Sequence, residues 1–305
     1  MAIQKVGVVG CGLMGHGIVQ VAAQGGCQVV VLEAEQKFLD SGLARIDKSL
    51  AKLAEKAAEK AVKEGKANEA DAKAKASADA AATRARIRGT TSQKDLADCD
   101  LVIEAIVEDL DVKKKLFKEL GALCKASTIF ASNTSSFPIG EMATASGRPA
   151  RFVGLHFFNP VQLMKLVEVV RTDATDAQVF EDAKAFGAAC GKAPVACKDT
   201  PGFVVNRLLV PYMTEAMRML ERGDASAQDI DTAMKLGCGY PMGPIELTDY
   251  VGLDTTLSIV EGWTKRYPNE PAFTVPAVLR EKVKLGKLGR KTGEGFYKWE
   301  GDKRA

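Results

Sequence analysis

The residues best suited to proton chemistry are His156 and Glu168. His156 is one of only two histidines in the chain, and it lies in the run Gly154-Leu155-His156-Phe157-Phe158-Asn159-Pro160. Histidine titrates near neutral pH, and a neighbouring carboxylate can fix its tautomer and stabilise the imidazolium. If the protein carries out proton chemistry near neutral pH, His156 is therefore the residue expected to perform it, with Glu168 as the natural candidate for its partner. The alternative interpretation is a hydrogen-bonded core histidine at the end of a strand.

A glycine-rich turn near the start of the chain indicates a nucleotide site. The apolar run 6–9 leads into Gly10-Cys11-Gly12-Leu13-Met14-Gly15 and then into a helical pattern. In this arrangement the glycines permit a tight turn, close approach to a diphosphate and close packing of helix on strand. A second strand, 28–32, ends at Glu33, where a carboxylate binds the ribose hydroxyls and repels a 2′-phosphate. The pattern predicts NAD binding; the alternative is a glycine turn with an exposed glutamate.

The remaining strands should position these residues in one crevice. Strands are expected at 101–105, 128–132 and 152–155, separated by helical sequence, which predicts an α/β fold with a Rossmann-type, doubly wound and mostly parallel sheet. Ligands of such sheets bind beyond the carboxyl ends of the strands. The polar residues at those ends are Glu104, Glu108, Asn133, Thr134, Ser135, Ser136, His156 and Asn159. Their convergence favours the catalytic interpretation of His156.

A charged segment, about residues 38–88, interrupts the sheet. Its apolar residues recur at helical spacing, Gly65 breaks the run, and a second helix begins at Asn68 or Glu69, so we expect an antiparallel helical hairpin. From Arg45 to Arg88 there are twelve basic and seven acidic residues, and 12 − 7 = +5. Lys48, Lys52, Lys56 and Lys60 are spaced four apart, which costs about 0.2–0.5 kcal/mol per like-charged pair. A polyanion such as coenzyme A would offset that cost; the alternative is a solvated helix face.

Length and composition set the wider limits. A chain of 305 residues suits two domains, which we place at 1–198 and 199–305, the second all-helical with Ser226 as a helix cap. The apolar and charged fractions are those of a soluble protein, and the net charge of +3 gives no reason to expect nucleic acid or a membrane as partner. Seven scattered cysteines without a Cys-x-x-Cys pair argue against disulfides and a metal site and favour the cytoplasm. The first residues run directly into a strand, so no targeting segment is expected.

Together these motifs resemble the L-3-hydroxyacyl-CoA dehydrogenase family over nearly the whole chain. The resemblance rests on the glycine turn, Ser132-Asn133-Thr134-Ser135-Ser136, the His156 run, and Lys198-Asp199-Thr200-Pro201-Gly202-Phe203-Val204-Val205-Asn206-Arg207. It extends through Gly239-Tyr240-Pro241-Met242-Gly243-Pro244 to Lys291-Thr292-Gly293-Glu294-Gly295-Phe296-Tyr297. The hairpin departs from the family in its richness in alanine and lysine, which puts the individual coenzyme A contacts there in doubt.

The resemblance implies a role for each matched residue. His156 would be the general base, Glu168 its partner, and Ser135 and Asn206 the contacts of the reacting oxygen. NAD would be held by Gly10, Cys11, Gly12, Leu13, Met14, Gly15, Glu33, Glu108, Lys113, Ser135, Asn159 and Lys291. Coenzyme A would contact Ser49, Lys56 and Ser135. The implied activity is reversible, NAD-dependent oxidation of short-chain (S)-3-hydroxyacyl-CoA, and the implied partner is a second copy bound through the helical domain.

Two other functions compete with this one. A hydroxyacid dehydrogenase with a catalytic lysine shares a similar glycine turn, but the His156 and Glu168 pair and the basic hairpin weigh against it. A dinucleotide-binding structural protein that has lost catalysis is the other alternative, and the joint presence of His156, Glu168, Ser135 and Asn206 weighs against that. Acyl-chain length and physiological direction do not follow from the sequence.

Overall fold

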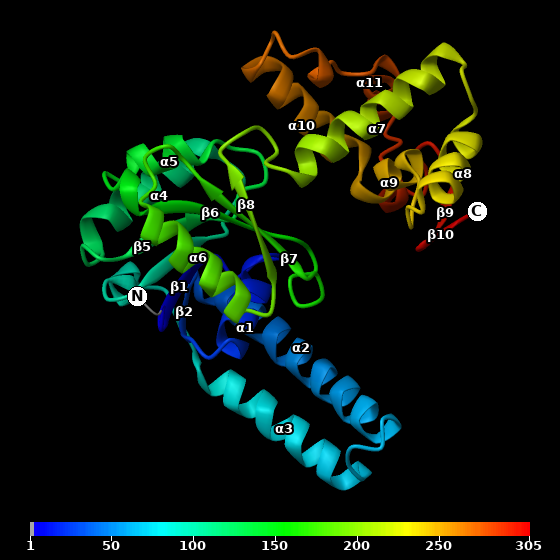
Figure 1. Cartoon of the computed structure of the whole chain (residues 1–305). Coiled ribbons are helices and arrows are strands. Elements are labelled where there is room, and N and C mark those ends of the chain that lie inside the picture. The colour runs from blue at the N-terminus through cyan, green and yellow to red at the C-terminus, as the bar shows by residue number, and fades with distance from the viewer. Residues whose placement is uncertain (1–2) are drawn as a thin grey trace. The chain divides into compact units, whose positions relative to one another are not determined.

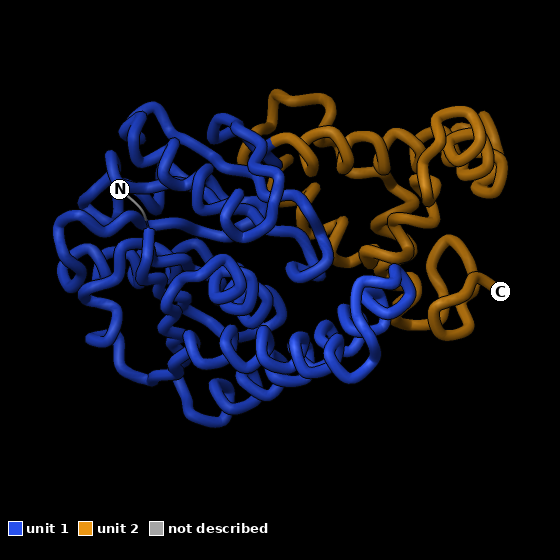
Figure 2. Tube along the Cα trace, turned by 60° about the horizontal axis from the view of Figure 1, so that its bottom comes forward, with its two compact units in different colours: residues 1–203 blue, residues 204–305 orange. Residues whose placement is uncertain are grey.

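The computed structural model describes residues 3–305 and divides into two compact units, Met1–Phe203 and Val204–Ala305 (Figure 2). We refer to them as unit 1 and unit 2. Each has its own hydrophobic core.

Unit 1 is built on one eight-stranded sheet with the order β3-β2-β1-β4-β5-β6-β7-β8. The strands are β1 (Lys5–Val9), β2 (Gln28–Leu32), β3 (Ile87–Thr90), β4 (Leu101–Glu104), β5 (Ile129–Ser132), β6 (Phe152–Phe157), β7 (Leu166–Arg171) and β8 (Ala193–Lys198). All neighbouring pairs in this sheet are parallel except β6 and β7, which are antiparallel. The predicted mostly parallel, doubly wound sheet is confirmed, and β3, β7 and β8 are strands that the sequence did not reveal.

Helices cover both faces of the sheet. Val6 and Val8 of β1 belong to the core beside α1 (Gly15–Gln24) and α6 (Ala177–Ala189). Val9 belongs to the opposite core, beside α4 (Leu110–Leu123) and α5 (Ile139–Ala145). Because successive strand side chains point to opposite faces, a strand rich in valine can be buried on both sides.

The expected helical hairpin is confirmed as α2 (Gln36–Lys63) and α3 (Glu69–Ala85), which lie side by side (Figure 1). Gly65 takes a positive φ of 67° in the turn between them. The Asn68 side chain accepts a hydrogen bond from the Asp71 backbone at 2.9 Å and so caps α3. The base of the hairpin is fixed to the sheet because Leu39, Ile46 and Leu50 join the core beside α1.

Unit 2 consists mainly of helices. They are α7 (Val205–Arg222), α8 (Ala227–Cys238), α9 (Pro244–Val251), α10 (Leu253–Arg266) and α11 (Ala277–Lys284). The expected all-helical domain needs one correction: β9 (Trp299–Glu300) and β10 (Lys303–Arg304) form a short antiparallel pair near the end of the chain. Ser226 caps α8, as predicted, by accepting a hydrogen bond from the Asp229 backbone at 3.1 Å.

Four short 3₁₀ helices complete the structure: η1 (Gln93–Leu96), η2 (Pro149–Arg151), η3 (Pro271–Phe273) and η4 (Arg290–Thr292). None of the helices in residues 3–305 combines the length and apolar character needed to cross a bilayer.

Candidate active site

His156 and Glu168 lie directly opposite each other where the sheet becomes antiparallel. They are register partners on β6 and β7, and the His156 Nδ1 and Glu168 Oε2 atoms are 2.7 Å apart. His156 is buried, and Glu168 is completely enclosed. With the proton on Nδ1 donated to the carboxylate, Nε2 is the ring nitrogen with a basic lone pair. The geometry is therefore suited to proton transfer through Nε2.

The loop after β5 is attached to the strand that carries His156. The Asn133 side-chain oxygen accepts a hydrogen bond from the Phe157 backbone at 2.9 Å, and the Asn133 backbone donates to the Glu104 carbonyl at 2.9 Å. The ends of β4, β5 and β6 are thus bonded to one another. This confirms that the polar residues following these strands gather at one edge of the sheet.

A buried ion pair between Lys113 and Glu104 lies at the end of β4, next to that edge of the sheet. The Lys113 ammonium, from α4, lies 2.5 Å from Glu104 and 3.0 Å from Glu108. Glu104 also accepts a hydrogen bond from the Ser132 hydroxyl at 2.6 Å. Both Glu104 and Lys113 are inaccessible to solvent, a burial that sequence reasoning missed because lysine and glutamate are rarely enclosed unless paired.

Glu108 contacts both Lys113 and the loop of residues 134–136, which includes Ser135. Its carboxylate accepts hydrogen bonds from the Thr134 hydroxyl and from the Ser136 hydroxyl at 3.1 Å, and the Ser135 backbone nitrogen is 3.4 Å away. Burial acts to raise the pKa of Glu108, but Lys113 and the hydroxyl donors outweigh it and lower the pKa below its ordinary value. A charged Glu108 therefore holds the loop that carries Ser135.

The glycine turn has the local geometry that a diphosphate needs. Gly10 has a φ of 95°, and a Cβ on Gly15 would lie 1.8 Å from the Gly10 carbonyl oxygen. At Gly12 a Cβ would meet nothing within 4 Å, so the backbone there is open to a ligand. Helix α1 starts without a side-chain cap or an acidic residue in its first turn. These observations fit an anion at the start of α1.

Cys11 and Glu33 connect the turn to β2. The Cys11 backbone nitrogen donates to Glu33 Oε1 at 2.6 Å, which places the carboxylate beside the glycine turn. Burial, aided by Glu33, raises the pKa of the Cys11 thiol to about 12, so it stays neutral at physiological pH. Of the other two loop residues, Leu13 is exposed and Met14 is half-buried.

The other predicted contacts lie in the loop after β6 and in unit 2. Asn159 is exposed in the loop between β6 and β7. Asn206 and Lys291 belong to unit 2, and the Lys291 ammonium is 2.6 Å from the Asp254 carboxylate. Within unit 1 the structure connects the ends of β4, β5 and β6 with Glu108 and Lys113, while the functional roles of all the predicted residues stay predictions.

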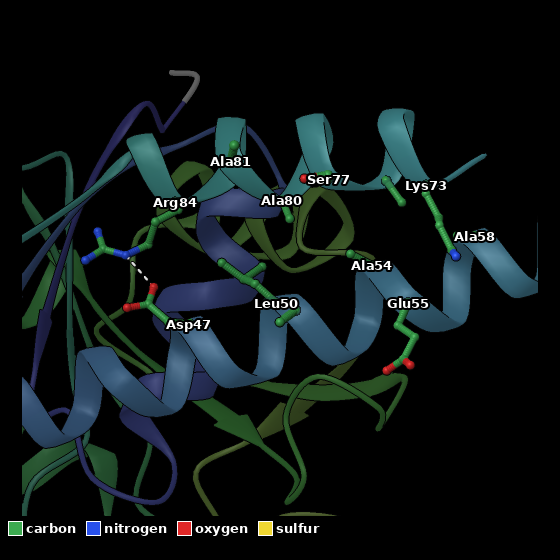
Figure 3. Close-up of a pocket in the computed structure, with 12 residues that line it drawn as sticks. Asp47, Leu50, Ala54, Glu55, Ala58, Lys73, Ser77, Ala80, Ala81 and Arg84 are labelled. Atoms are coloured by element: carbon green, nitrogen blue, oxygen red, sulfur yellow. Dashed lines mark hydrogen bonds and ion pairs between the residues drawn. The ribbon is translucent and has the colours of Figure 1, made fainter. Parts of the chain in front are cut away.

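On the hairpin, Ser49 is half-buried, and Lys48, Lys52, Lys56 and Lys60 are exposed. The helix also borders a groove of about 450 Å³ between α2 and α3 (Figure 3). Leu50, Ala54 and Ala58 line that groove, and none of the four lysines does. Since residues four apart share a helix face, the lysines form a face of their own, separate from the groove.

Comparison with known proteins gives one consistent family. The model of the 3-hydroxyacyl-CoA dehydrogenase NAD-binding domain matches residues 5–200, and that of the 3-hydroxyacyl-CoA dehydrogenase C-terminal domain matches residues 202–299. Human mitochondrial hydroxyacyl-coenzyme A dehydrogenase is 50% identical over 298 residues, covering 98% of this chain and 92% of that protein.

Bacterial proteins give the same result. The probable 3-hydroxybutyryl-CoA dehydrogenase of Deinococcus radiodurans is 48% identical over 299 residues, with 97% of this chain and 100% of that protein covered. The crystal structure of (S)-3-hydroxybutyryl-CoA dehydrogenase from Ralstonia eutropha superposes with a TM-score of 0.87 at 40% identity, covering 98% of this chain and 100% of the other. The chain belongs to the 3-hydroxyacyl-CoA dehydrogenase family and is an NAD-dependent dehydrogenase.

Proposed function

We propose that the protein interconverts short-chain (S)-3-hydroxyacyl-CoA and 3-ketoacyl-CoA, with 3-hydroxybutyryl-CoA and acetoacetyl-CoA as the preferred pair. The observation that carries this proposal is the hydrogen bond of 2.7 Å between His156 and Glu168 at the edge of an NAD-binding sheet. The names of the Deinococcus and Ralstonia relatives support the four-carbon substrate.

In this mechanism His156 moves the proton. Its Nε2 takes the proton from the C3 hydroxyl during oxidation, and Glu168 stabilises the imidazolium that forms. In the reverse direction His156 returns the proton to the ketone oxygen. When bound, NAD accepts the hydride during oxidation, and NADH donates it in the reverse direction. Ser135 and Asn206 donate hydrogen bonds to the reacting oxygen, an interaction worth about 2.7–4 kcal/mol per donor in other enzymes.

The cofactor is held by the glycine turn and by Glu33. The open backbone at Gly12 receives the diphosphate, and the Glu33 carboxylate binds the ribose hydroxyls, so NADH is used in preference to NADPH. Glu108, Ser135, Asn159 and Lys291 complete the NAD contacts in this proposal, and Lys113 supports them. Because Lys113 is enclosed between two carboxylates, we assign its contribution to the placement of Glu108.

Coenzyme A binds along the lysine face of α2, near Ser49 and Lys56. Phosphates on this face would neutralise like charges that otherwise repel one another. None of these lysines lines the groove between α2 and α3. The lysine face is therefore a charged surface, which suits the phosphates of coenzyme A better than an apolar ligand.

A homodimer formed through unit 2 and a cytoplasmic location are also part of the proposal. Leu208, Leu236 and Leu285 of unit 2 are 70%, 83% and 62% exposed, and covering such side chains would favour association with a second copy. Sedimentation equilibrium tests the dimer. Cell fractionation tests the location, because free cysteines fit any reducing compartment and the human relative is named as mitochondrial.

The decisive experiment follows NADH oxidation with acetoacetyl-CoA, then with free acetoacetate, and then repeats the first reaction with NADPH. We expect turnover with the thioester and NADH and little with the other two combinations. No turnover of the thioester would overturn the proposal. The His156→Ala variant should lose turnover while binding NADH normally, and wild-type rates in that variant would show that the base lies elsewhere.

A further inference from the structure

The segment that follows β8 is fixed to unit 1 through Asp199. The Asp199 carboxylate accepts hydrogen bonds from the backbone nitrogens of Ile139, at 3.0 Å, and Gly140, at 2.8 Å. These nitrogens open α5, which follows the loop that carries Ser135. Four residues further on, the Phe203 backbone donates to the Thr200 carbonyl at 2.9 Å and closes a turn. Phe203, the last residue of unit 1, is therefore held in a defined place.

Phe203 has an unfavourable backbone conformation. Its φ is 54°, and no other non-glycine residue in the range 3–305 has a positive φ. A side chain in this left-handed region normally clashes with the backbone, so glycine is the residue that such a position favours. Strain of this kind persists where the surrounding structure requires it, and it gathers at functional sites. A phenylalanine at this position suggests that its side chain makes a contact that offsets the backbone strain.

The Phe203 ring packs against the general base proposed above. Its centroid lies 5.6 Å from that of the His156 imidazole, with 56° between the two planes. The Phe158 ring lies 4.4 Å from the same imidazole. Together with the hydrogen bond to Glu168, these contacts leave the imidazole little freedom to rotate. Phe203 itself is 5% exposed, so its ring is fixed by the core beside α4 and α5.

We propose that Phe203 is a positioning residue for His156: the strained turn at residues 200–203 presses its ring on the imidazole and holds Nε2 toward the substrate. The inference rests on the proposed function, because it presumes that His156 is the base. Misplacement of a catalytic group by about 1 Å can cost about 100-fold in rate, so the loss of this contact should be visible in kcat.

Two substitutions remove the ring in different ways. Phe203→Leu keeps an apolar side chain in the core, and Phe203→Gly relieves the strain at positive φ. We expect both to lower kcat with acetoacetyl-CoA about tenfold or more, with the KM for NADH within about twofold of wild type. Phe203→Tyr keeps the ring and should retain kcat within about threefold. Phe180→Leu is the matched control, since Phe180 is 6% exposed, lies on α6 and belongs to the other core.

A spectroscopic measurement separates positioning from simple core packing. Only His16 and His156 carry imidazole rings, so in protein labelled at histidine the His156 ring signals can be assigned with the His156→Ala variant. Loss of the Phe203 ring current shifts the His156 signals in any case, because the ring lies 5.6 Å from the imidazole, so the diagnostic quantity is the separation between the Nδ1 and Nε2 nitrogen shifts, which reports how fully the proton stays on Nδ1. Phe203→Leu and Phe203→Gly should reduce this separation, and Phe180→Leu should leave it unchanged even if it lowers the melting temperature as much.

The two proposals can fail separately. If the wild-type protein does not reduce acetoacetyl-CoA, the proposed function falls. If wild type and His156→Ala behave as expected while Phe203→Leu and Phe203→Gly keep wild-type kcat, the positioning role alone is overturned. A fall in kcat that Phe180→Leu reproduces in full would also overturn it, because general loss of packing would then explain the effect.

Discussion

The His156 ring and the Glu168 carboxylate are joined by one hydrogen bond of 2.7 Å across the antiparallel strand pair of an otherwise parallel sheet. In a wholly parallel arrangement, a residue twelve positions after His156 could not return to face it, because parallel neighbours need a crossover connection. The change of strand direction after β6 is thus what brings two residues twelve positions apart into a hydrogen-bonded pair.

The first prediction concerns the charge of Glu168. Glu168→Gln keeps the size of the side chain but removes the negative charge that stabilises the imidazolium, and we expect kcat to fall about 100-fold or more with the KM for NADH little changed. Steady-state kinetics with acetoacetyl-CoA measures both. Glu181→Gln, at an exposed glutamate on α6, is the control and should behave as wild type. A Glu168→Gln variant with wild-type kcat would refute the pairing as a catalytic device.

The second prediction concerns the lysine face of α2. Lys56→Glu should raise the KM for acetoacetyl-CoA and leave the KM for NADH unchanged, and the effect should shrink as salt increases. Lys118→Glu makes the same change in net charge at an exposed position of α4, so it controls for the overall field of the protein. Equal effects of the two substitutions on the KM for acetoacetyl-CoA would show that the lysines of α2 are only a solvated helix face and do not bind coenzyme A.

Much of the fold could be predicted because its signals are local. Periodic apolar residues, the break at Gly65 and the cap at Asn68 define the hairpin, and each of these acts within a few residues. The glycine turn is equally local, since it joins one strand to the next helix. These are the features for which pattern and backbone chemistry agree.

The missed strands lack such signals. β3 has four residues, Ile87–Thr90, and includes Gly89, while β8 has Pro194 and a mostly exposed surface. Both lie at the edges of the sheet, where pairing with a single neighbour allows sequences with little strand character. β7 is buried, but it was missed because Glu168 was interpreted as a catalytic candidate and the apolar residues on either side of it were not interpreted as a strand.

Two buried lysines, Lys113 in the candidate site and Lys192 outside it, were hidden for a different reason. Lys113 and Lys192 are both buried, although lysine belongs on the surface by its usual behaviour. Their burial is balanced by partners from distant segments: Glu104 for Lys113, and the Val161 and Met164 carbonyls for Lys192. Such compensation depends on tertiary contacts, which one sequence does not display.

The third prediction follows from Lys192. Its ammonium donates to two backbone carbonyls of the loop between β6 and β7, and burial, with a contribution from Lys165, lowers its pKa. Lys192→Met would leave these carbonyls without a charged donor and should reduce the free energy of unfolding by about 1–3 kcal/mol.

Urea unfolding followed by circular dichroism measures this loss. Both tryptophans, Trp263 and Trp299, lie in unit 2, so tryptophan fluorescence would report on the wrong unit. Lys165→Met, at an exposed lysine of the same loop, should change the free energy of unfolding by no more than about 0.5 kcal/mol. Equal stability of Lys192→Met and wild type would show that the two hydrogen bonds contribute nothing net.

The last prediction concerns pH and Glu108. Its pKa in the folded protein is lowered from an ordinary value of 4.5, so the folded state favours the charged carboxylate more than the unfolded state does. The stabilisation is therefore fully present above pH 4.5 and is lost as the pH falls through the lower, folded value.

Glu108→Gln lacks this contribution at every pH. The difference in free energy of unfolding between wild type and Glu108→Gln should be largest near neutral pH and should shrink in acid, as measured by urea unfolding at about pH 7, 5 and 3. Because the Glu108 side chain is 40% exposed, solvent screens part of the effect, and we expect a modest difference. A difference that stays constant across this range, or grows in acid, would show that Lys113 and the hydroxyl donors do not favour the charged form of Glu108 in the folded protein.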